Sequence, residues 1–282
     1  MPHPALVPGA VAVVTGGGSG IGLAAAKRFL GLGMRVCIAE RDGARLEAAV
    51  EELHALGDPA NVLGAAVDVA KVAEVRTLEA TVEAQFGGTD VLMNNAGIQP
   101  GSDIFDQSET WERILGVNLW GIIHGSQVFA PGMIAHGRPG LIINTGSKQG
   151  ITTPPGDPAY NVAKAGVKAF TEALQHELRS TSNCRISAHL LIPGFVWTSL
   201  TARGRTEKPA GAWTPEQTVD FMLERLATDD FYILCPDNDV PRPLDEKRIL
   251  WAAGDIAENR PALSRWHPDY AEAFKAFVEA KD

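Results

Sequence analysis

Short apolar runs alternate with longer amphipathic segments along the first two thirds of the chain. The runs are rich in Val, Ile, Leu and Ala and show no regular alternation with polar residues, which is typical of strands buried on both faces. The predicted strands cover residues 11–14, 35–39, 62–67, 91–93, 141–144 and 186–192.

Between these runs, apolar residues recur at the spacing of a helix with one buried face. The predicted helices cover residues 19–32, 43–56, 72–86, 108–135 and 157–179. An alternation of strand and helix predicts βαβ units with right-handed crossovers. We therefore expect an α/β fold with a doubly wound parallel sheet of the Rossmann type, covered by helices on both faces.

The pattern loosens after Pro193 and Gly194. Residues 198–211 are polar and interrupted, which predicts a loop or a loose helix. A new helix is expected directly afterwards, with Thr214 as its N-cap and Pro215 in its first turn.

An apolar run at residues 231–235 predicts a last strand, and the tail beyond it contains several prolines and turn-forming residues before a helix from about Tyr270. No internal repeat or low-complexity linker interrupts the chain, so a single domain is the simplest prediction. Its expected parts are a cofactor-binding and catalytic core at residues 8–194, a substrate-binding loop and helix at 195–230, and a C-terminal helical arm at 236–282.

Composition and charge narrow the class of protein. The chain has 282 residues, of which 45% are hydrophobic and 21% charged, which is ample for a sizeable core. Its net charge of −9 argues against non-specific nucleic-acid binding, which needs a basic surface. Its N-terminus shows no signal peptide, and no uncharged run approaches the length of a membrane span. We expect a cytoplasmic protein without nucleic-acid or membrane partners.

The three cysteines lie in or beside predicted strands and are odd in number, so we interpret Cys37, Cys184 and Cys235 as core residues and not as a disulfide framework. The histidines, among them His124 and His189, show no ligand spacing, so no metal site is expected.

A glycine cluster follows the first predicted strand and precedes the first helix. Glycine permits a tight turn and lets backbone amides approach a phosphate, which the helix N-terminus also attracts. Residues 20–25 also fit a G-x-G-x-x-A string, but that register puts the turn too far from the strand, so we favour one that starts at Gly16. A purely structural turn is the alternative; the position in the first βαβ unit favours dinucleotide binding. The residues expected to contact the cofactor here are Gly16, Gly18, Ser19, Gly20, Ile21 and Gly22.

The second predicted strand ends at Glu40 and Arg41. An acidic residue at this position can accept hydrogen bonds from the ribose hydroxyls of the adenosine and repels a 2′-phosphate. Arg41 has the opposite effect, because a guanidinium can bind that phosphate. A solvated turn is the structural alternative. We predict NAD as the favoured cofactor, with NADP possible.

A tyrosine and a lysine one helical turn apart, Tyr160 and Lys164, follow Ser147 at the end of a predicted strand. Residues i and i+4 share a helix face. A unit charge at about 4 Å is worth about 4 kcal/mol at an effective dielectric near 20, or about three pKa units. Lys164, helped by a positive nicotinamide, is therefore expected to bring the phenol of Tyr160 near neutrality for acid–base catalysis. Ser147 is expected to orient the substrate oxygen.

These positions give the chain a resemblance to the short-chain dehydrogenase/reductase family over roughly residues 8–200. The matching motifs are Thr15-Gly16-x-x-x-Gly20-x-Gly22, Asn94-Asn95-Ala96-Gly97, Asn118, Ser147, Tyr160-x-x-x-Lys164 and Pro193-Gly194-x-x-x-Thr198. The resemblance implies a catalytic set of Asn118, Ser147, Tyr160 and Lys164, in which Tyr160 is the general acid/base, Lys164 also binds the nicotinamide ribose, and Asn118 holds a water that relays protons.

The resemblance also implies further cofactor contacts, namely Asp68 and Val69 at the adenine, Asn95, Ala96 and Gly97 along the cleft, and residues 192–198, including Pro193, Gly194, Val196 and Thr198, at the nicotinamide. Structural alternatives exist for three of these positions. Asn118 could bond only within its own helix. Asp68 could cap the next helix. Asn95 could chiefly satisfy loop backbone groups.

The C-terminal region departs from the family, because many members end soon after the last strand. The extension casts doubt on the common tetramer interface, while a dimer through the helices that hold Asn118 and Tyr160 is still implied. We expect a homodimer or a homotetramer. Trp251, Trp266 and Tyr270 in the arm are expected to pack on the body in preference to reaching a neighbouring subunit.

Substrate identity is largely hidden in the sequence. Aromatic residues near the site suggest a medium-sized apolar or cyclic secondary alcohol or ketone, and Gln149 is placed to bond a second oxygen on it. The substrate contacts predicted most directly are Ser147, Gln149, Tyr160 and Trp197, with Gln99, Pro154, Phe195, Leu200 and Trp213 as further candidates.

Three functions are compatible with this fold and these motifs. Reversible hydride transfer between a nicotinamide dinucleotide and a secondary alcohol/ketone pair is favoured. A non-catalytic dinucleotide-sensing protein on the same fold is disfavoured, because a sensor has no use for an activated phenol. Dehydration or epimerisation is disfavoured by the glycine spacing and the modest C-terminal region.

Overall fold

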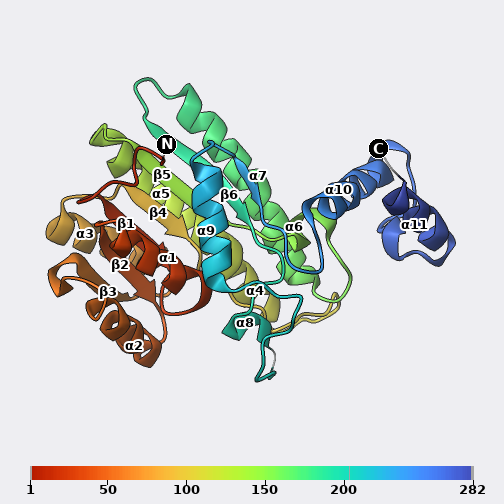
Figure 1. Cartoon of the computed structure of the whole chain (residues 1–282), viewed down its shortest axis with the longest axis horizontal. Coiled ribbons are helices and arrows are strands. Elements are labelled where there is room, and N and C mark those ends of the chain that lie inside the picture. The colour runs from red at the N-terminus through yellow and green to blue at the C-terminus, as the bar shows by residue number, and fades with distance from the viewer. Residues whose placement is uncertain (1, 203, 281–282) are drawn as a thin grey trace.

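A parallel sheet of seven strands forms the centre of the molecule in the computed structural model, which describes residues 2–202 and 204–280 (Figure 1). The strand order is β3-β2-β1-β4-β5-β6-β7, and every neighbouring pair is parallel. The order reverses direction beside β1, as in a doubly wound sheet. The strands are β1 (Val11–Thr15), β2 (Arg35–Glu40), β3 (Val62–Ala66), β4 (Val91–Asn94), β5 (Gly140–Thr145), β6 (Ile186–Ile192) and β7 (Tyr232–Leu234).

Helices cover both faces of this sheet. The α-helices are α1 (Gly20–Gly31), α2 (Gly43–His54), α3 (Val72–Phe86), α4 (Thr110–Leu115), α5 (Gly121–Ala135), α6 (Gln149–Thr152), α7 (Pro158–Ser180), α8 (Ser199–Ala202), α9 (Pro215–Leu226), α10 (Arg242–Ala257) and α11 (Ala271–Glu279). A π-helical turn, η2 (Gly116–Trp120), joins α4 to α5, and 3₁₀ turns are η1 (Pro59–Asn61), η3 (Ser264–Trp266) and η4 (Pro268–Tyr270).

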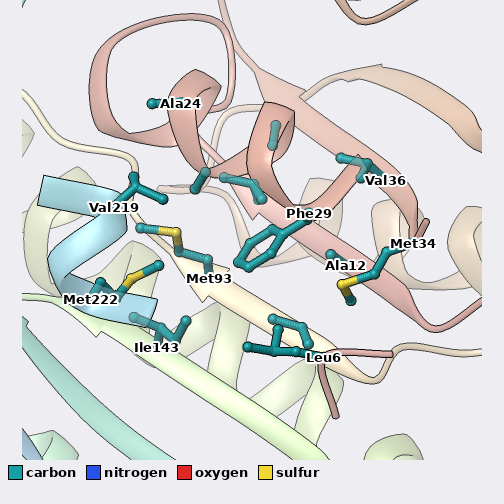
Figure 2. Packing of buried hydrophobic residues seen from close by; sticks show 14 of the residues in the cluster. Leu6, Ala12, Ala24, Phe29, Met34, Val36, Met93, Ile143, Val219 and Met222 are labelled. Carbon is teal, nitrogen blue, oxygen red and sulfur yellow. The ribbon is translucent and has the colours of Figure 1, made fainter. Parts of the chain in front are cut away.

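Each strand places successive apolar side chains into two different cores, which explains why the runs do not alternate with polar residues. Ala12 and Val14 of β1 pack with α1, α2 and α9 on one face. Val11 and Val13 pack with α3, α5 and α7 on the other. Figure 2 shows the first core, where Phe29 of α1 lies among residues from the sheet and from α9. Both faces of β1 are therefore covered by apolar side chains.

The sequence predicts all seven strands and the helix that begins at Thr214. The Thr214 hydroxyl accepts the N–H of Gln217 at 3.2 Å, and the Gln217 side chain accepts the N–H of Thr214 at 2.8 Å, which forms a complete capping box. The predicted helix at residues 108–135 is interrupted by η2. Within the described part of the chain, no helix is long and apolar enough to cross a membrane.

The arm after β7 contains a helix that the sequence analysis missed, α10. Figure 1 shows α10 leaving the body beside α6, with α11 farther from the sheet. Trp251 of α10 is 5% exposed, and its ring lies 5.3 Å from the rings of Phe274 and Phe277. Trp251 is therefore buried, but the core that buries it is built by the arm's own residues and not by the body, on which we expected it to pack.

The cysteines occupy the expected surroundings. Cys37 and Cys235 are buried and Cys184 is partly buried, and all three are free thiols. Burial raises the pKa of both Cys37 and Cys235 to about 12, so neither is a reactive thiolate.

Candidate active site

The glycine turn between β1 and α1 has the geometry that backbone binding of a phosphate requires. Gly16 and Gly20 have φ values of +63° and +54°, a region that favours glycine. A Cβ on Gly22 would lie 2.2 Å from the carbonyl oxygen of Gly16, so the helix closes directly on the turn. Asn95 fixes the turn from the side, because its Nδ2 donates to the carbonyl oxygens of Thr15 and Gly16 at 3.3 and 3.4 Å.

The turn opens into a cleft of about 720 Å³ along the carboxyl ends of the strands. Open parallel sheets bind ligands at this edge, and the volume lies within the range of small-molecule sites. Together with the N-terminus of α1, whose amides attract anions, the cleft fits a dinucleotide. The predicted residues that line it are Gly16, Ser19, Gly20, Ile21, Glu40, Arg41, Asp68, Val69, Asn95, Ala96, Gly97, Ser147, Tyr160, Lys164, Pro193, Gly194, Val196 and Thr198.

Five predicted residues lie outside the described lining, namely Gly18, Gly22, Asn118, Gln149 and Trp197. Gly18 and Gly22 instead shape the turn. Residues that the sequence analysis missed also line the cleft, and they include Asp42, Arg45, Arg113, Thr145 and Ser199. Asp42 and Arg45 begin the helix that follows β2, a signal that could have located them. Arg113 lies one turn before η2, and no sequence motif distinguishes it.

Glu40 at the end of β2 is held in place by its own turn. Its Oε1 accepts the N–H groups of Arg41 at 2.9 Å and of Asp42 at 3.2 Å. Its Cγ would lie 2.8 Å from a Cβ on Gly18, so the carboxylate packs directly against the glycine turn. The acidic group therefore has a fixed position at one end of the cleft.

Asp68 lies in the turn before α3 and does not cap that helix. Its Oδ1 accepts the N–H of Ala70 at 3.1 Å, which stabilises the turn before α3, whereas the helix N-cap itself is Lys71. Asp68 also lines the cleft. The alternative that Asp68 caps the next helix is therefore wrong, and its contact with the adenine stays a prediction.

Ser147, Tyr160 and Lys164 converge at the other end of the cleft. Tyr160 and Lys164 share one face of α7, and both are buried, with 7% and 3% of their surface exposed. The Nζ of Lys164 donates to the carbonyl oxygen of Thr145 at 2.7 Å and lies 5.7 Å from the ring centroid of Tyr160. The Oγ of Ser147 accepts the N–H of Gln149 at 3.1 Å.

Burial dominates the ionisation of this group. Burial raises the pKa of Tyr160 to about 12, against the hydrogen bond from Ser147 that lowers it. Burial also lowers the pKa of Lys164 to about 8. For the protein's own groups, burial thus keeps the pKa of the phenol above its ordinary value. That Lys164 together with a positive nicotinamide brings Tyr160 near neutrality stays a prediction.

Asn118 lies in η2 and is fully buried. Its Oδ1 accepts the N–H of Ile98, and its Nδ2 donates to the carbonyl oxygen of the same residue, each at 2.7 Å. Its side chain thus stabilises the loop after β4. Asn118 therefore neither bonds only within its own helix nor lines the cleft. The relay water stays a prediction.

The substrate candidates divide into two groups. Gln99 and Leu200 line the cleft, and the Nε2 of Gln99 donates to the Oε1 of Gln149 at 3.3 Å, which brings Gln149 to its edge. Trp213 instead packs against the core, with its ring 5.7 Å from that of Phe221. Besides Gln149, the candidates outside the described lining are Pro154, Phe195, Trp197 and Trp213.

Comparison with known proteins identifies the family. Residues 10–209 match the model of the short chain dehydrogenase family, so the chain belongs to that family and is an oxidoreductase. It is 30% identical over 261 residues to 1-deoxy-11-beta-hydroxypentalenate dehydrogenase of Streptomyces exfoliatus, covering 90% of this chain and 93% of the relative.

Solved structures agree with this assignment. A short chain dehydrogenase/reductase from Burkholderia phymatum in complex with NAD superposes with a TM-score of 0.81 at 31% identity, covering 90% of this chain and 96% of that one. A metagenomic short-chain oxidoreductase in complex with NADP superposes with a TM-score of 0.66 at 28% identity, covering 82% and 98%.

Proposed function

We propose that the protein catalyses reversible hydride transfer between NAD(H) and a secondary alcohol/ketone pair. The observation that carries this proposal is the convergence of Ser147, Tyr160 and Lys164 in the same cleft as the glycine turn. One end of the cleft can hold a dinucleotide and the other can move a proton. A purely dinucleotide-sensing protein would need only the first end.

Within this proposal each polar group has one task. Ser147 orients the substrate oxygen, and Tyr160 takes up or returns the proton at that oxygen. Lys164 binds the nicotinamide ribose, and its carbonyl partner Thr145 fixes the amine at 2.7 Å. When bound, the nicotinamide accepts or supplies hydride and adds positive charge in its oxidised form. A positive charge near the phenol favours the phenolate, which opposes the effect of burial.

We propose that the cleft prefers NAD over NADP. The carboxylate of Glu40 is fixed by two backbone N–H groups, so it cannot swing away from an added 2′-phosphate without losing both bonds. Arg41 and Arg45 also line the cleft and work against this preference. The ratio of kcat/KM for the two cofactors measures the outcome. Glu40→Gln should shift that ratio toward NADP by about tenfold if one close like-charge repulsion is removed.

We propose a medium-sized apolar or cyclic secondary alcohol or ketone as the substrate. The name of the Streptomyces relative includes a hydroxyl-bearing compound, which supports an alcohol as substrate. Leu200 and Pro100 supply apolar lining to the cleft, while the Gln99–Gln149 pair offers amide groups to a second oxygen.

The protein is further proposed to act in the cytoplasm as a single-domain homodimer or homotetramer. Trp120 beside α5 and Val162 on α7 are 52% and 50% exposed, which supports an interface on the helices near Asn118 and Tyr160. Light scattering of the purified protein, with a Trp120→Glu variant as the comparison, would measure the oligomeric state.

Removal of the phenolic oxygen of Tyr160 tests the catalytic proposal. Tyr160→Phe should abolish turnover on a panel of cyclic alcohols, followed by reduced-nicotinamide absorbance, and should leave dinucleotide binding nearly unchanged. Tyr232→Phe is the matched control, because Tyr232 bonds Glu172 at the surface of α7. Retained turnover in Tyr160→Phe would disprove the acid/base role. Dinucleotide binding without turnover in the wild type would favour the sensing function.

A further inference from the structure

A buried ion cluster joins the C-terminal arm to the body directly behind the active site. The Nζ of Lys148 lies 2.6 Å from Asp245 Oδ2 and 3.3 Å from Asp237 Oδ2. The side chain of Lys148 is 18% exposed, and those of both aspartates are 5% exposed. We call Lys148, Asp237 and Asp245 the ionic clasp. Ion pairs this far from solvent are geometrically demanding, because each charge gives up its hydration.

The first member of the clasp is covalently bound to Ser147. Lys148 is the next residue in the loop after β5, and its backbone N–H donates to the carbonyl oxygen of Pro193 at 3.4 Å. Its own carbonyl oxygen accepts the N–H groups of Ile151 at 3.0 Å and Thr152 at 3.1 Å in α6. A displacement of Lys148 therefore moves the backbone that positions Ser147.

The second member binds the loop after β6. Asp237 Oδ2 accepts the N–H of Phe195 at 3.1 Å, while its Oδ1 accepts the N–H of Val240 at 2.8 Å. A Cβ on Gly194 would lie 2.5 Å from Asp237 Oδ2 and 2.9 Å from Lys148 Nζ. The clasp thus packs directly on Gly194, whose other side faces the cleft lined by Pro193, Gly194 and Val196.

The third member lies in the first helix of the arm. Asp245 lies in the first turn of α10, and its pKa is raised by burial against the lowering effect of Lys148. The helix packs on α6, and Ile249 one turn later contacts the cluster that contains Leu234. Beyond this junction the arm is stabilised by its own aromatic residues. The clasp is accordingly the polar anchor of the arm on the body.

We propose that Lys148, Asp237 and Asp245 are positioning residues, through which the C-terminal arm holds the Ser147 loop and the 193–196 loop in their catalytic arrangement. This inference rests on the proposed function for the role of Ser147. The arm then acts as a support of the active site, and its attachment sets the rate of the chemical step. Two loops that approach the reacting atoms from different strands are linked by one lysine.

Neutral variants of similar size test the clasp in the full chain. Lys148→Met and Asp245→Asn should each lower kcat by about ten- to a hundredfold, because misplacement of orienting groups costs this much. The dissociation constant for NAD, measured by fluorescence titration, should stay close to that of the wild type, since the Glu40 end of the cleft is untouched. The double variant should lower kcat no further than Lys148→Met alone does, because both substitutions remove the same ion pair.

Matched controls come from exposed ion pairs on α10 and α7. Glu246→Gln changes the residue next to Asp245, but Glu246 pairs with Arg242 in solvent, where both side chains are about half exposed at 53% and 49%. Lys168→Met removes an amine that pairs with Glu172 on α7. Both controls should keep the wild-type kcat.

Hydrogen exchange separates the clasp from the proposed function. The Phe195 amide should exchange about tenfold faster or more in Lys148→Met, because its acceptor Asp237 loses its countercharge. If Lys148→Met fails to fold, the double variant of Lys148→Met with Asp245→Asn is measured instead, because it leaves the net charge of the clasp unchanged. If the double variant also fails to fold, Asp245→Asn alone is measured. Folded variants with unchanged kcat and unchanged exchange at Phe195 would overturn the proposal. If the wild type shows no turnover, the proposed function fails, and the exchange result alone decides whether the clasp orders these loops.

Discussion

Replacing Lys164 with methionine removes a buried amine, and burial makes the charged form of that amine unfavourable. The side chain is 3% exposed, and burial lowers the pKa of Lys164 from 10.5 to about 8. Between these two values the unfolded chain binds more protons than the folded one, so the stability of the wild type rises with pH across this window. The pKa of Tyr160 is raised, and its effect has the opposite sign but begins only above about pH 10.

The size of the effect follows from the shift. At about 1.4 kcal/mol for each pKa unit, the charged amine costs about 3 kcal/mol below pH 8. From pH 7 to pH 10 the wild type should therefore gain about 2 kcal/mol of unfolding free energy relative to Lys164→Met. Urea unfolding at intervals of one pH unit measures this difference, with each curve analysed at its own midpoint.

Lys168→Met provides the baseline, because Lys168 lies one turn further along α7 and is 39% exposed beside Glu172. Its stability difference from the wild type should be small and nearly independent of pH in this range. If the curves for the wild type and Lys164→Met ran parallel from pH 7 to pH 10, Lys164 would not be the buried titrating group and the reasoning would fail.

Two further predictions concern the glycine turn and the arm. Gly22→Ala should weaken dinucleotide binding by at least about tenfold in a fluorescence titration, because the new methyl group meets the carbonyl oxygen of Gly16 at 2.2 Å. Gly31→Ala in the same helix, with open space around its Cβ, is the control, and equal affinities for the two variants would contradict this. Trp251→Ala should destabilise the arm by about 3–5 kcal/mol and expose α11 to proteolysis while the sheet stays folded. An arm that resists cleavage as well as the wild type would be inconsistent with its separate aromatic core.

The central sheet could be predicted because its strands are buried on both faces. Such strands appear in the sequence as short continuous apolar runs, and the helices between them have one apolar face. Both signals depend on the residues alone. The same holds for the glycine turn and for the i, i+4 pair Tyr160 and Lys164, because their spacing directly determines which groups share a turn or a helix face.

Helix α10 could not be predicted because its apolar residues do not form one buried stripe. Leu250 and Ile256 are 63% and 88% exposed, whereas Trp251 between them is buried by residues of the following helix. Prolines at positions 236, 241 and 243 also favour turns at its start. Their effect is limited here, since Pro243 lies in the first turn, where a missing N–H costs little.

The ionisation of Tyr160 shows a second limit. The sequence reveals the neighbouring amine but not the depth of burial, and these two influences have opposite signs. Only the folded chain shows that burial raises the pKa of Tyr160 and lowers the pKa of Lys164. The sequence also did not reveal the clasp, because Lys148 is distant in sequence from Asp237 and Asp245, and the three residues match no motif.

The π-helical turn η2 limits how the helix around it can change in length. A π turn contains one more residue than an α turn, and each residue rotates the following side chains by about 100°. Loss of one residue between positions 116 and 120 would swing Asn118 away from Ile98 and leave both backbone groups of Ile98 without their partner. Among homologous chains, insertions and deletions should therefore gather in the loop at residues 99–109 and avoid this turn.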